Sequence, residues 1–172
     1  INTTGTTGSS TASTVKGISA ASTTASNGFG AFMMYANGAT NAAIGTTLTF
    51  AGEATTLSTG QNTKERGILV QGGRTLTMSG DVTLDGSSKS SEGISFGGTL
   101  NMATVAGVTN KLTLKGTTAA SSNSALNGVN FSGTITGNAA TSSINIIGEA
   151  NNLSGTNYDT AVNMAGSITG SS

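Results

Sequence analysis

The segment Leu112-Thr113-Leu114-Lys115-Gly116 has two apolar residues two positions apart and a glycine two positions after the second of them. Alternation of this kind is typical of a β-strand with one buried face. The pattern occurs, in full or in part, four more times, and the glycines of the five copies are Gly17, Gly52, Gly86, Gly116 and Gly148. Their spacing averages about 33 residues, which lies in the range of stacked repeat architectures. The sequence therefore predicts a repeating unit that contains this strand.

Two further families of alternating apolar residues complete the repeat. The first family consists of Phe32/Met34, Ile68/Val70, Ile94/Phe96, Val129/Phe131 and Val162/Met164. The second family follows the first after a short glycine-containing turn, and its members are Leu76/Met78, Leu100/Met102, Ile135 and Ile168. Three strands of roughly five residues and three turns fill a repeat of this length. Helices fit poorly, because Thr, Gly, Ser and Asn make up more than half of the chain and are weak helix formers.

We predict an all-β protein that forms a right-handed parallel β-helix, a β-solenoid with three strands per coil and about five coils of about 33 residues. Residues 1–172 are expected to be a single solenoid segment, a fragment or repeating unit of a longer fibre. Each strand should pair with its equivalents in the neighbouring coils, so that Leu84, Leu114 and Ile146 lie above one another in one core. The glycine after each apolar pair is expected at a sharp corner, where a positive φ favours glycine.

The two ends of the sequence match the same phase of the repeat. Ile1 and Ile168 both correspond to the second strand of a coil, the strand of the Leu76/Met78 family. Open coil ends are strand edges that can pair with further strands, and solenoids normally need caps. We therefore expect self-association end to end, or continuation into further coils. The weakest part of the core is expected at residues 36–43, where only alanines are available to the second strand.

The composition excludes most catalytic and ligand-binding chemistry. The chain has no His and no Cys, so the commonest general base and zinc ligand and the thiolate nucleophile are all missing. Seven basic residues balance seven acidic ones, and no apolar run is long enough to span a membrane. We expect no enzyme activity, no cofactor, no nucleic-acid partner and no membrane insertion. No catalytic, cofactor-binding or metal-binding residue is therefore assigned.

Two pairs of opposite charges are predicted on the strands that contain the glycine pattern, the third strand of each coil. Alignment of the repeats places Asp81 beside Lys111 and Asp85 beside Lys115. We interpret them as exposed cross-strand ion pairs, each worth roughly 0.2 to 1 kcal/mol. Calcium bound by the two aspartates is the alternative, but a third carboxylate and the glycine-rich and aspartate-rich nonapeptide of calcium-binding β-rolls are missing.

Three phrases of the sequence resemble those of a known class of large bacterial exoproteins. They are Gly93–Leu100 (GISFGGTL), Lys111–Thr118 (KLTLKGTT) and Gly128–Gly137 (GVNFSGTITG). From about Gly67 to Ser172 the text resembles the stalk repeats of filamentous-haemagglutinin-like and high-molecular-weight adhesins of two-partner secretion. The resemblance implies a β-helical stalk that is secreted or held on the bacterial cell surface, exported through an outer-membrane partner, and active in adhesion, aggregation or biofilm formation.

Two outward surfaces are candidate binding sites. By alternation, the second strands present a polar grid that consists of Thr75, Thr77, Thr99, Thr134, Thr136 and Thr169, interrupted by Asn101 and Ser167. Regular threonine ladders resemble ice-binding surfaces, although threonine also suits any exposed strand. Met33, Tyr35 and Leu69 form an apolar patch that either lies under a loop or contacts another chain laterally.

The main functional hypothesis is a structural and adhesive segment of an extracellular bacterial fibre, without catalysis. Its partners would be further coils or further copies, and a receptor on a host or bacterial surface. Ice binding through the threonine grid is the first alternative. Carbohydrate binding is the second alternative, but it would need a row of exposed aromatic residues, whereas the only tyrosines are Tyr35 and Tyr158 and the chain has no tryptophan.

Overall fold

The computed structural model describes residues 2–3, 13–19, 30–34, 41–44, 47–55, 65–102, 109–119, 126–138, 142–151 and 160–171. These residues form β-strands and short connections, and they include no helix. Within the same ranges, therefore, no helix is long and apolar enough to cross a membrane. All strand pairs are parallel, and the strands belong to three sheets. The prediction of an all-β fold is confirmed.

The three sheets are named here by their strands. Sheet A consists of β1 (Asn2–Thr3), β4 (Asn41–Ile44), β7 (Thr75–Met78), β10 (Thr99–Met102), β13 (Thr134–Asn138) and β16 (Ser167–Ser171). Sheet B consists of β2 (Ser13–Ser19), β5 (Leu48–Ala54), β8 (Val82–Ser88), β11 (Asn110–Thr118) and β14 (Ser142–Ala150). Sheet C consists of β3 (Gly30–Met34), β6 (Arg66–Val70), β9 (Ile94–Phe96), β12 (Asn127–Phe131) and β15 (Thr160–Met164).

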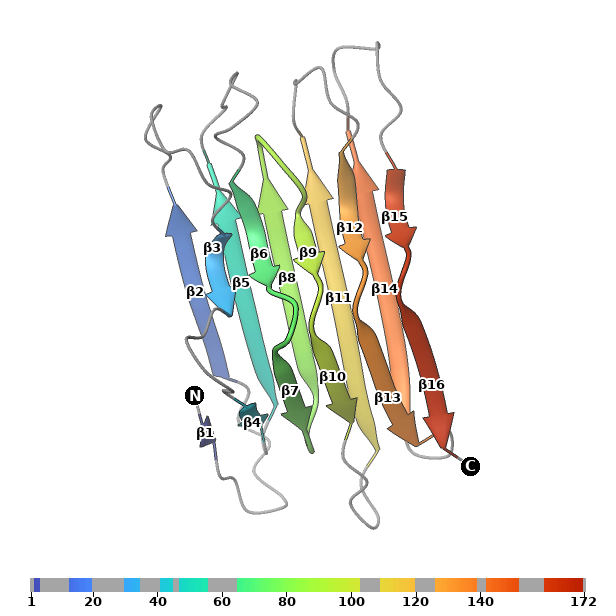
Figure 1. Cartoon of the computed structure of the whole chain (residues 1–172). Helices are drawn as coiled ribbons and strands as arrows, with labels where there is room; N and C mark the ends of the chain where they lie inside the picture. The colour runs from blue at the N-terminus through green and yellow to red at the C-terminus, as the bar shows by residue number, and fades with distance from the viewer. Residues whose placement is uncertain are drawn as a thin grey trace.

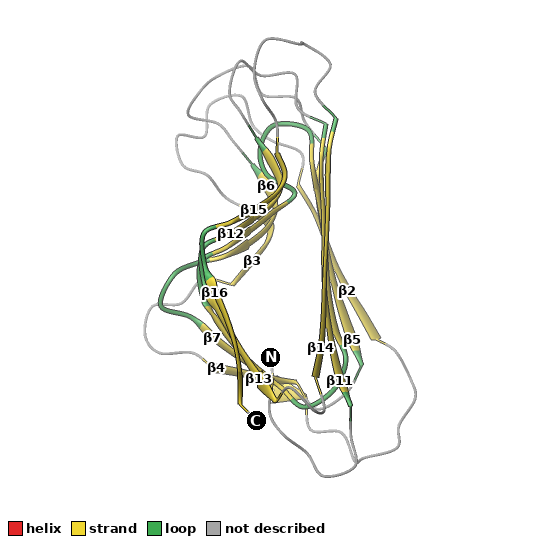
Figure 2. Cartoon of the chain, turned by 90° about the vertical axis from the view of Figure 1, so that its right-hand side faces the viewer, coloured by secondary structure: helices red, strands yellow, loops and turns green. Residues whose placement is uncertain are grey.

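The chain winds as a right-handed parallel β-helix with three strands per coil. It passes from sheet B to sheet C, then to sheet A and back to sheet B, so each strand pairs with the third strand before it and the third strand after it. Figure 1 shows the equivalent strands side by side from β2 to β14, and Figure 2 shows the three sheets around a common axis. The predicted order of the three apolar families in a coil is confirmed.

The register of the strands stacks like residues on like. We call a set of residues paired across successive coils a column. One inward column of sheet B runs through Val15, Phe50, Leu84, Leu114 and Ile146. In sheet C, Phe96 pairs with Phe131, and their stacked rings have centroids 5.3 Å apart. The core is therefore continuous along the axis, and Leu84 and Leu114 are completely buried in it.

The glycines that follow the apolar pairs of sheet B do not form corners. Gly52, Gly86 and Gly116 lie inside β5, β8 and β11, and the only positive φ among the described residues belongs to Gly73, in the turn between β6 and β7. The expectation of sharp corners at these glycines was wrong. Their place in one column is confirmed, however, because Gly17, Gly52, Gly86, Gly116 and Gly148 pair across all five strands.

These glycines instead allow two sheets to approach each other closely. A Cβ added at Gly116 would lie closer than 3.0 Å to the backbone of Gly128 in sheet C, a distance that real Cβ atoms essentially never show. Gly52 and Gly86 face Gly67 and Gly93 in the same way. Two glycine columns therefore let the backbones of sheets B and C touch, at the narrow end of the coil seen in Figure 2.

Two other details of the strands differ from expectation. The second strand expected at residues 36–43 is β4 (Asn41–Ile44), in which Ala42 pairs with Leu76 and Ile44 pairs with Met78. An apolar residue beyond the alanines is therefore in register with the core column. Sheet B also has strands of 7 to 9 residues, longer than the expected five, because pairing continues past the glycine column.

The start of the chain has the expected phase. The strand β1 (Asn2–Thr3) pairs with β4 in sheet A, and β16 lies at the other edge of the same sheet. Both edges of sheet A are thus formed by second strands of the repeat. Ile1 itself lies outside the described residues.

Candidate binding faces

The threonine grid is present on the outer face of sheet A. Thr75, Thr99 and Thr134 occupy one column, which Ser167 continues. The second column holds Thr77, Asn101, Thr136 and Thr169. In β7 and β10 these residues alternate with fully buried leucines and buried methionines, so their side chains point outward as predicted. The structure brings all six predicted threonines together on one face.

Hydrogen bonds between coils engage part of this grid. Thr136 Oγ1 donates to Asn101 Oδ1 over 2.6 Å, and Ser167 Oγ donates to Thr134 Oγ1 over 3.3 Å. Thr169 Oγ1 donates to the carbonyl oxygen of Ile135 over 3.4 Å. These contacts fix side-chain rotamers and align the hydroxyl groups along the axis. The face is therefore an ordered polar surface whose hydroxyls are partly used within the protein.

A second threonine column lies on sheet B and was not predicted as a site. It consists of Thr14, Thr49, Thr83 and Thr113, and Asn145 continues it. Thr49, Thr83 and Thr113 each lie between the two apolar residues of their strand, as in Leu112-Thr113-Leu114, and Thr14 lies between Ser13 and Val15. The alternation that located the core therefore also contained the signal for this column.

Charged residues occupy the outer face of sheet B beside these threonines. Lys115 Nζ lies 3.5 Å from Asp85 Oδ2, which confirms the predicted pair, and Lys16 Nζ lies 3.1 Å from Glu53 Oε2. All four side chains are substantially exposed, so each pair contributes little to stability. Asp81 differs from expectation, because its carboxylate accepts a hydrogen bond of 2.9 Å from the backbone N–H of Lys111.

The predicted apolar patch is only partly described. Met33 pairs with Leu69 across β3 and β6, as the repeat requires, and Leu69 is half-buried. The side chain of Met33 and the whole of Tyr35 lie outside the described residues, and so does Tyr158. Neither the lateral contact nor a carbohydrate platform therefore has an observation in its favour.

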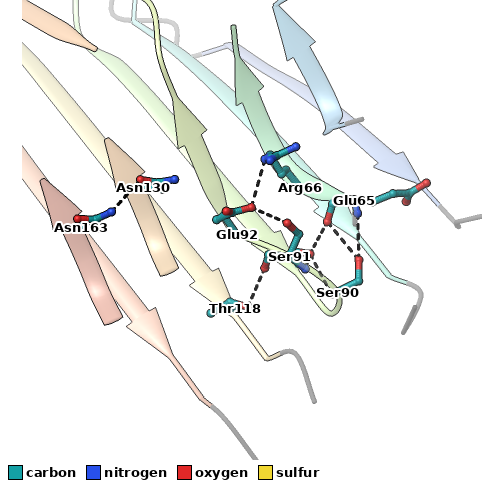
Figure 3. A network of polar contacts seen from close by, with 9 residues as sticks. Glu65, Arg66, Ser90, Ser91, Glu92, Thr118, Asn130 and Asn163 are labelled. Carbon is teal, nitrogen blue, oxygen red and sulfur yellow. Dashed lines mark hydrogen bonds and ion pairs between the residues drawn. The ribbon is translucent and has the colours of Figure 1, made fainter. Parts of the chain in front are cut away.

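The connection between β8 and β9 contains a buried polar network (Figure 3). Ser88 Oγ donates to the carbonyl oxygen of Glu65, and the N–H of Glu65 donates to Ser90 Oγ over 3.1 Å. One coil further on, Thr118 Oγ1 donates to the carbonyl oxygen of Ser91 over 2.7 Å. The three serines and Thr118 are buried. The hydroxyls of Ser88, Ser90 and Thr118 thus form hydrogen bonds with buried backbone groups at the turn.

Two side chains extend the network toward the surface. Ser91 Oγ donates to Glu92 Oε2, and Arg66 Nε lies 3.2 Å from the same carboxylate oxygen. Asn163 Nδ2 donates to Asn130 Oδ1 over 3.1 Å on the outer face of sheet C (Figure 3). A buried serine beside a carboxylate could suggest a nucleophile, but Ser91 has no exposed surface. The arrangement therefore ties successive coils together.

Removal of the Thr118 hydroxyl tests the contribution of this network. Thr118→Val keeps the volume of the side chain but leaves the carbonyl of Ser91 without this donor. We expect the free energy of unfolding to fall by about 1 to 2 kcal/mol, as measured by urea denaturation. The control is Thr117→Val on the outward side of the same strand, for which we expect almost no change. Equal unfolding midpoints for the two variants would contradict the prediction.

No metal centre is found in the part of the chain that the structure describes, where no three or more acidic residues gather to hold an ion. Asp81 and Asp85 therefore remain without the third carboxylate that the calcium alternative needs.

Comparisons with protein-family models, curated proteins and solved structures found no match.

Proposed function

We propose that this chain is a non-catalytic structural segment of an extracellular bacterial fibre, the stalk of a surface adhesin of the two-partner-secretion type. The observation that carries the proposal is the unbroken register of sheet B, in which one glycine column and one apolar column continue through five strands. Such a stack has no natural limit in length, because each coil offers the next coil the same surface. Its geometry suits a rod that holds binding regions away from a cell.

The described outer faces fit the same function. Each strand in the stack is hydrogen-bonded to its neighbours, about 4.8 Å away on either side. Threonine and asparagine columns cover parts of sheets A and B, while apolar residues fill the interior. A rod of this kind would resist bending, because strand pairing is continuous along the axis in each of the three sheets. Adhesion, aggregation or biofilm formation would depend on the regions that it carries or on its lateral faces.

The phrases that resemble adhesin stalks coincide with structural units. Lys111–Thr118 lies within β11, and Gly93–Leu100 spans β9 and the turn into β10. Gly128–Gly137 spans β12 and most of β13. The resemblance therefore concerns the elements that build the coil, which supports a stalk more directly than it supports any particular receptor.

Immunogold electron microscopy of the cells that produce the chain would test this function. Antibodies raised against the purified chain should decorate fibres that project from the cell surface, and the labels should lie along the fibre length. Cells in which the coding sequence is deleted are the control and should lose the label. Label confined to the cell interior would contradict the proposal.

Ice binding is a second candidate because of one observation, the alignment of two threonine-rich columns side by side on sheet A. A Thr99→Lys variant would place a long charged side chain in the middle of this grid. If the grid binds ice, the wild-type chain should show thermal hysteresis and the variant should lose most of it. Thr83→Lys on sheet B is the matched control. A wild-type chain without hysteresis or inhibition of recrystallisation would exclude the candidate.

A further inference from the structure

The strands of sheet A contain no charged residue, in contrast to those of the other two sheets. Their sequences are NT, NAAI, TLTM, TLNM, TITGN and SITGS. Sheet B includes Asp85 and Lys115, and sheet C includes Arg66. An ammonium group is strongly hydrated, so a face with lysines holds water in a shell around each charge. The threonine grid of sheet A presents hydroxyl, amide and methyl groups instead.

The hydroxyl groups of β13 and β16 are used within the protein. Thr136 Oγ1 donates to Asn101 Oδ1 over 2.6 Å, and a backbone carbonyl oxygen of β10 lies 3.4 Å from the same hydroxyl. Ser167 Oγ donates to Thr134 Oγ1, and Thr169 Oγ1 donates to a backbone carbonyl oxygen of β13. Each of these bonds joins one coil to the next. A hydroxyl hydrogen that is engaged in this way is not available to a ligand.

The threonines of β7 and β10 form a second set. Thr75, Thr77 and Thr99 are half-buried, and their hydroxyls make no hydrogen bond with another group in the part of the chain that the structure describes. The three residues are neighbours, because Thr75 pairs with Thr99 and Thr77 lies two positions after Thr75 on the same strand. A hydroxyl without a protein partner is satisfied by water or by a ligand. The hydrogen-bonding capacity of this cluster is therefore open to groups outside the chain.

The cluster is also rigid. Threonine has a restricted χ1 angle because two heavy atoms are bonded to its Cβ. The strands β7 and β10 pair with each other, and β4 and β13 pair with them on either side. A surface that is fixed before binding loses little conformational entropy when it meets a second ordered surface. An ordered, uncharged lattice therefore suits this cluster better than a flexible or charged partner does.

We propose that Thr75, Thr77 and Thr99 form the ice-contacting surface of this chain. Their three hydroxyls would hydrogen-bond to water molecules of the lattice, while the bonded hydroxyls of β13 and β16 would only keep the adjacent part of the face rigid. The threonine column of sheet B is not part of this surface, because charged residues such as Asp85 and Lys115 stand beside it. This inference rests on the ice-binding candidate above and names the residues that would carry it.

Two matched substitutions test the division of the grid. Thr77→Val and Thr136→Val each remove one hydroxyl and keep a β-branched side chain, and both positions belong to the column that runs through Asn101. The measurement is inhibition of ice recrystallisation by the whole chain. Thr77→Val should raise the concentration needed for half-maximal inhibition about fivefold, as expected for the loss of one hydrogen bond. Thr136→Val should leave this concentration unchanged, and circular dichroism would verify that both variants keep the fold.

The possible failures of this experiment are distinguishable. Equal losses in Thr77→Val and Thr136→Val, or no loss in Thr77→Val, would overturn the assignment of the contact to this cluster and leave ice binding itself standing. A wild-type chain that inhibits nothing would exclude ice binding, and this inference with it. The stalk would stand or fall separately, because immunogold labelling of surface fibres does not depend on ice.

Discussion

Replacement of Phe96 by alanine is expected to lower the free energy of unfolding by about 3 to 5 kcal/mol, the cost of removing a buried phenylalanine from a packed core. Phe96 has no exposed surface, and its ring is stacked on that of Phe131 in the next coil. The side chain lies in a middle coil, where neighbours on both sides are fixed by strand pairing. The cavity therefore has little scope to collapse. Urea denaturation followed by circular dichroism would measure the loss.

Ser95→Ala provides the control for this experiment. Ser95 precedes Phe96 in the same strand and is only half-buried, because alternation turns its side chain outward. We expect a change within about 0.5 kcal/mol, as for most surface substitutions. A Phe96→Ala protein that is as stable as the Ser95→Ala protein would show that the aromatic pair does not belong to the core.

Gly116→Ala is expected to be nearly as damaging, although it adds a single methyl group. The new Cβ would overlap the backbone of Gly128, and backbone atoms in two paired sheets cannot move aside as a side chain can. Overpacking usually costs 1 to 3 kcal/mol, and we expect about 3 kcal/mol or more here because both neighbours are held by strand ladders. Thermal unfolding and the yield of soluble protein would report the effect.

A second glycine separates this mechanism from a general effect of glycine replacement. A Cβ at Gly72, in the turn between β6 and β7, would meet only the carbonyl oxygen of Gly97 at 3.6 Å, an ordinary van der Waals distance. Gly72→Ala should therefore be close to neutral or slightly stabilising. If Gly116→Ala were equally mild, sheets B and C could not be in backbone contact at this point.

Much of the fold is predictable because the repeat carries the same information several times. The alternation of Leu48 and Phe50, of Val82 and Leu84 and of Leu112 and Leu114 defines a strand, its buried face and its partners at once. A one-residue error in any copy would expose its apolar pair, so the columns fix the register. The number of strands per coil and the parallel pairing follow from the same pattern.

The role of the glycine column could not be predicted in this way. A glycine is needed at position 116 because Gly128 approaches it from another sheet. The sequence repeat indicates which strands pair within a sheet, but not which strands of different sheets lie close together. Similarly, Asp81 could be aligned with Lys111, but the sequence does not tell whether a carboxylate will meet an ammonium group or a backbone N–H. The position of β4 depended on the length of a turn, which the weak signal of its alanines could not determine.

On the surface, too, some features are predictable from the sequence and others are not. Alternation correctly placed Thr75, Thr99 and Thr134 on one face, and the same alternation turns Thr49 and Thr83 outward on sheet B. The corner formed by Ser88 and Ser90 carried no comparable signal, because serine is frequent everywhere in this chain and hydroxyl partners depend on the path of the turn.

Each strand pairs only with its equivalents one coil away. We therefore expect this molecule to unfold one coil at a time when it is pulled from one end. Each released coil of about 33 residues would add on the order of 110 Å of extended chain. A sheet in which distant strands were neighbours would instead yield in one event. The result would be a tether that lengthens stepwise under load and keeps the remaining coils intact, since each of them retains its own neighbours.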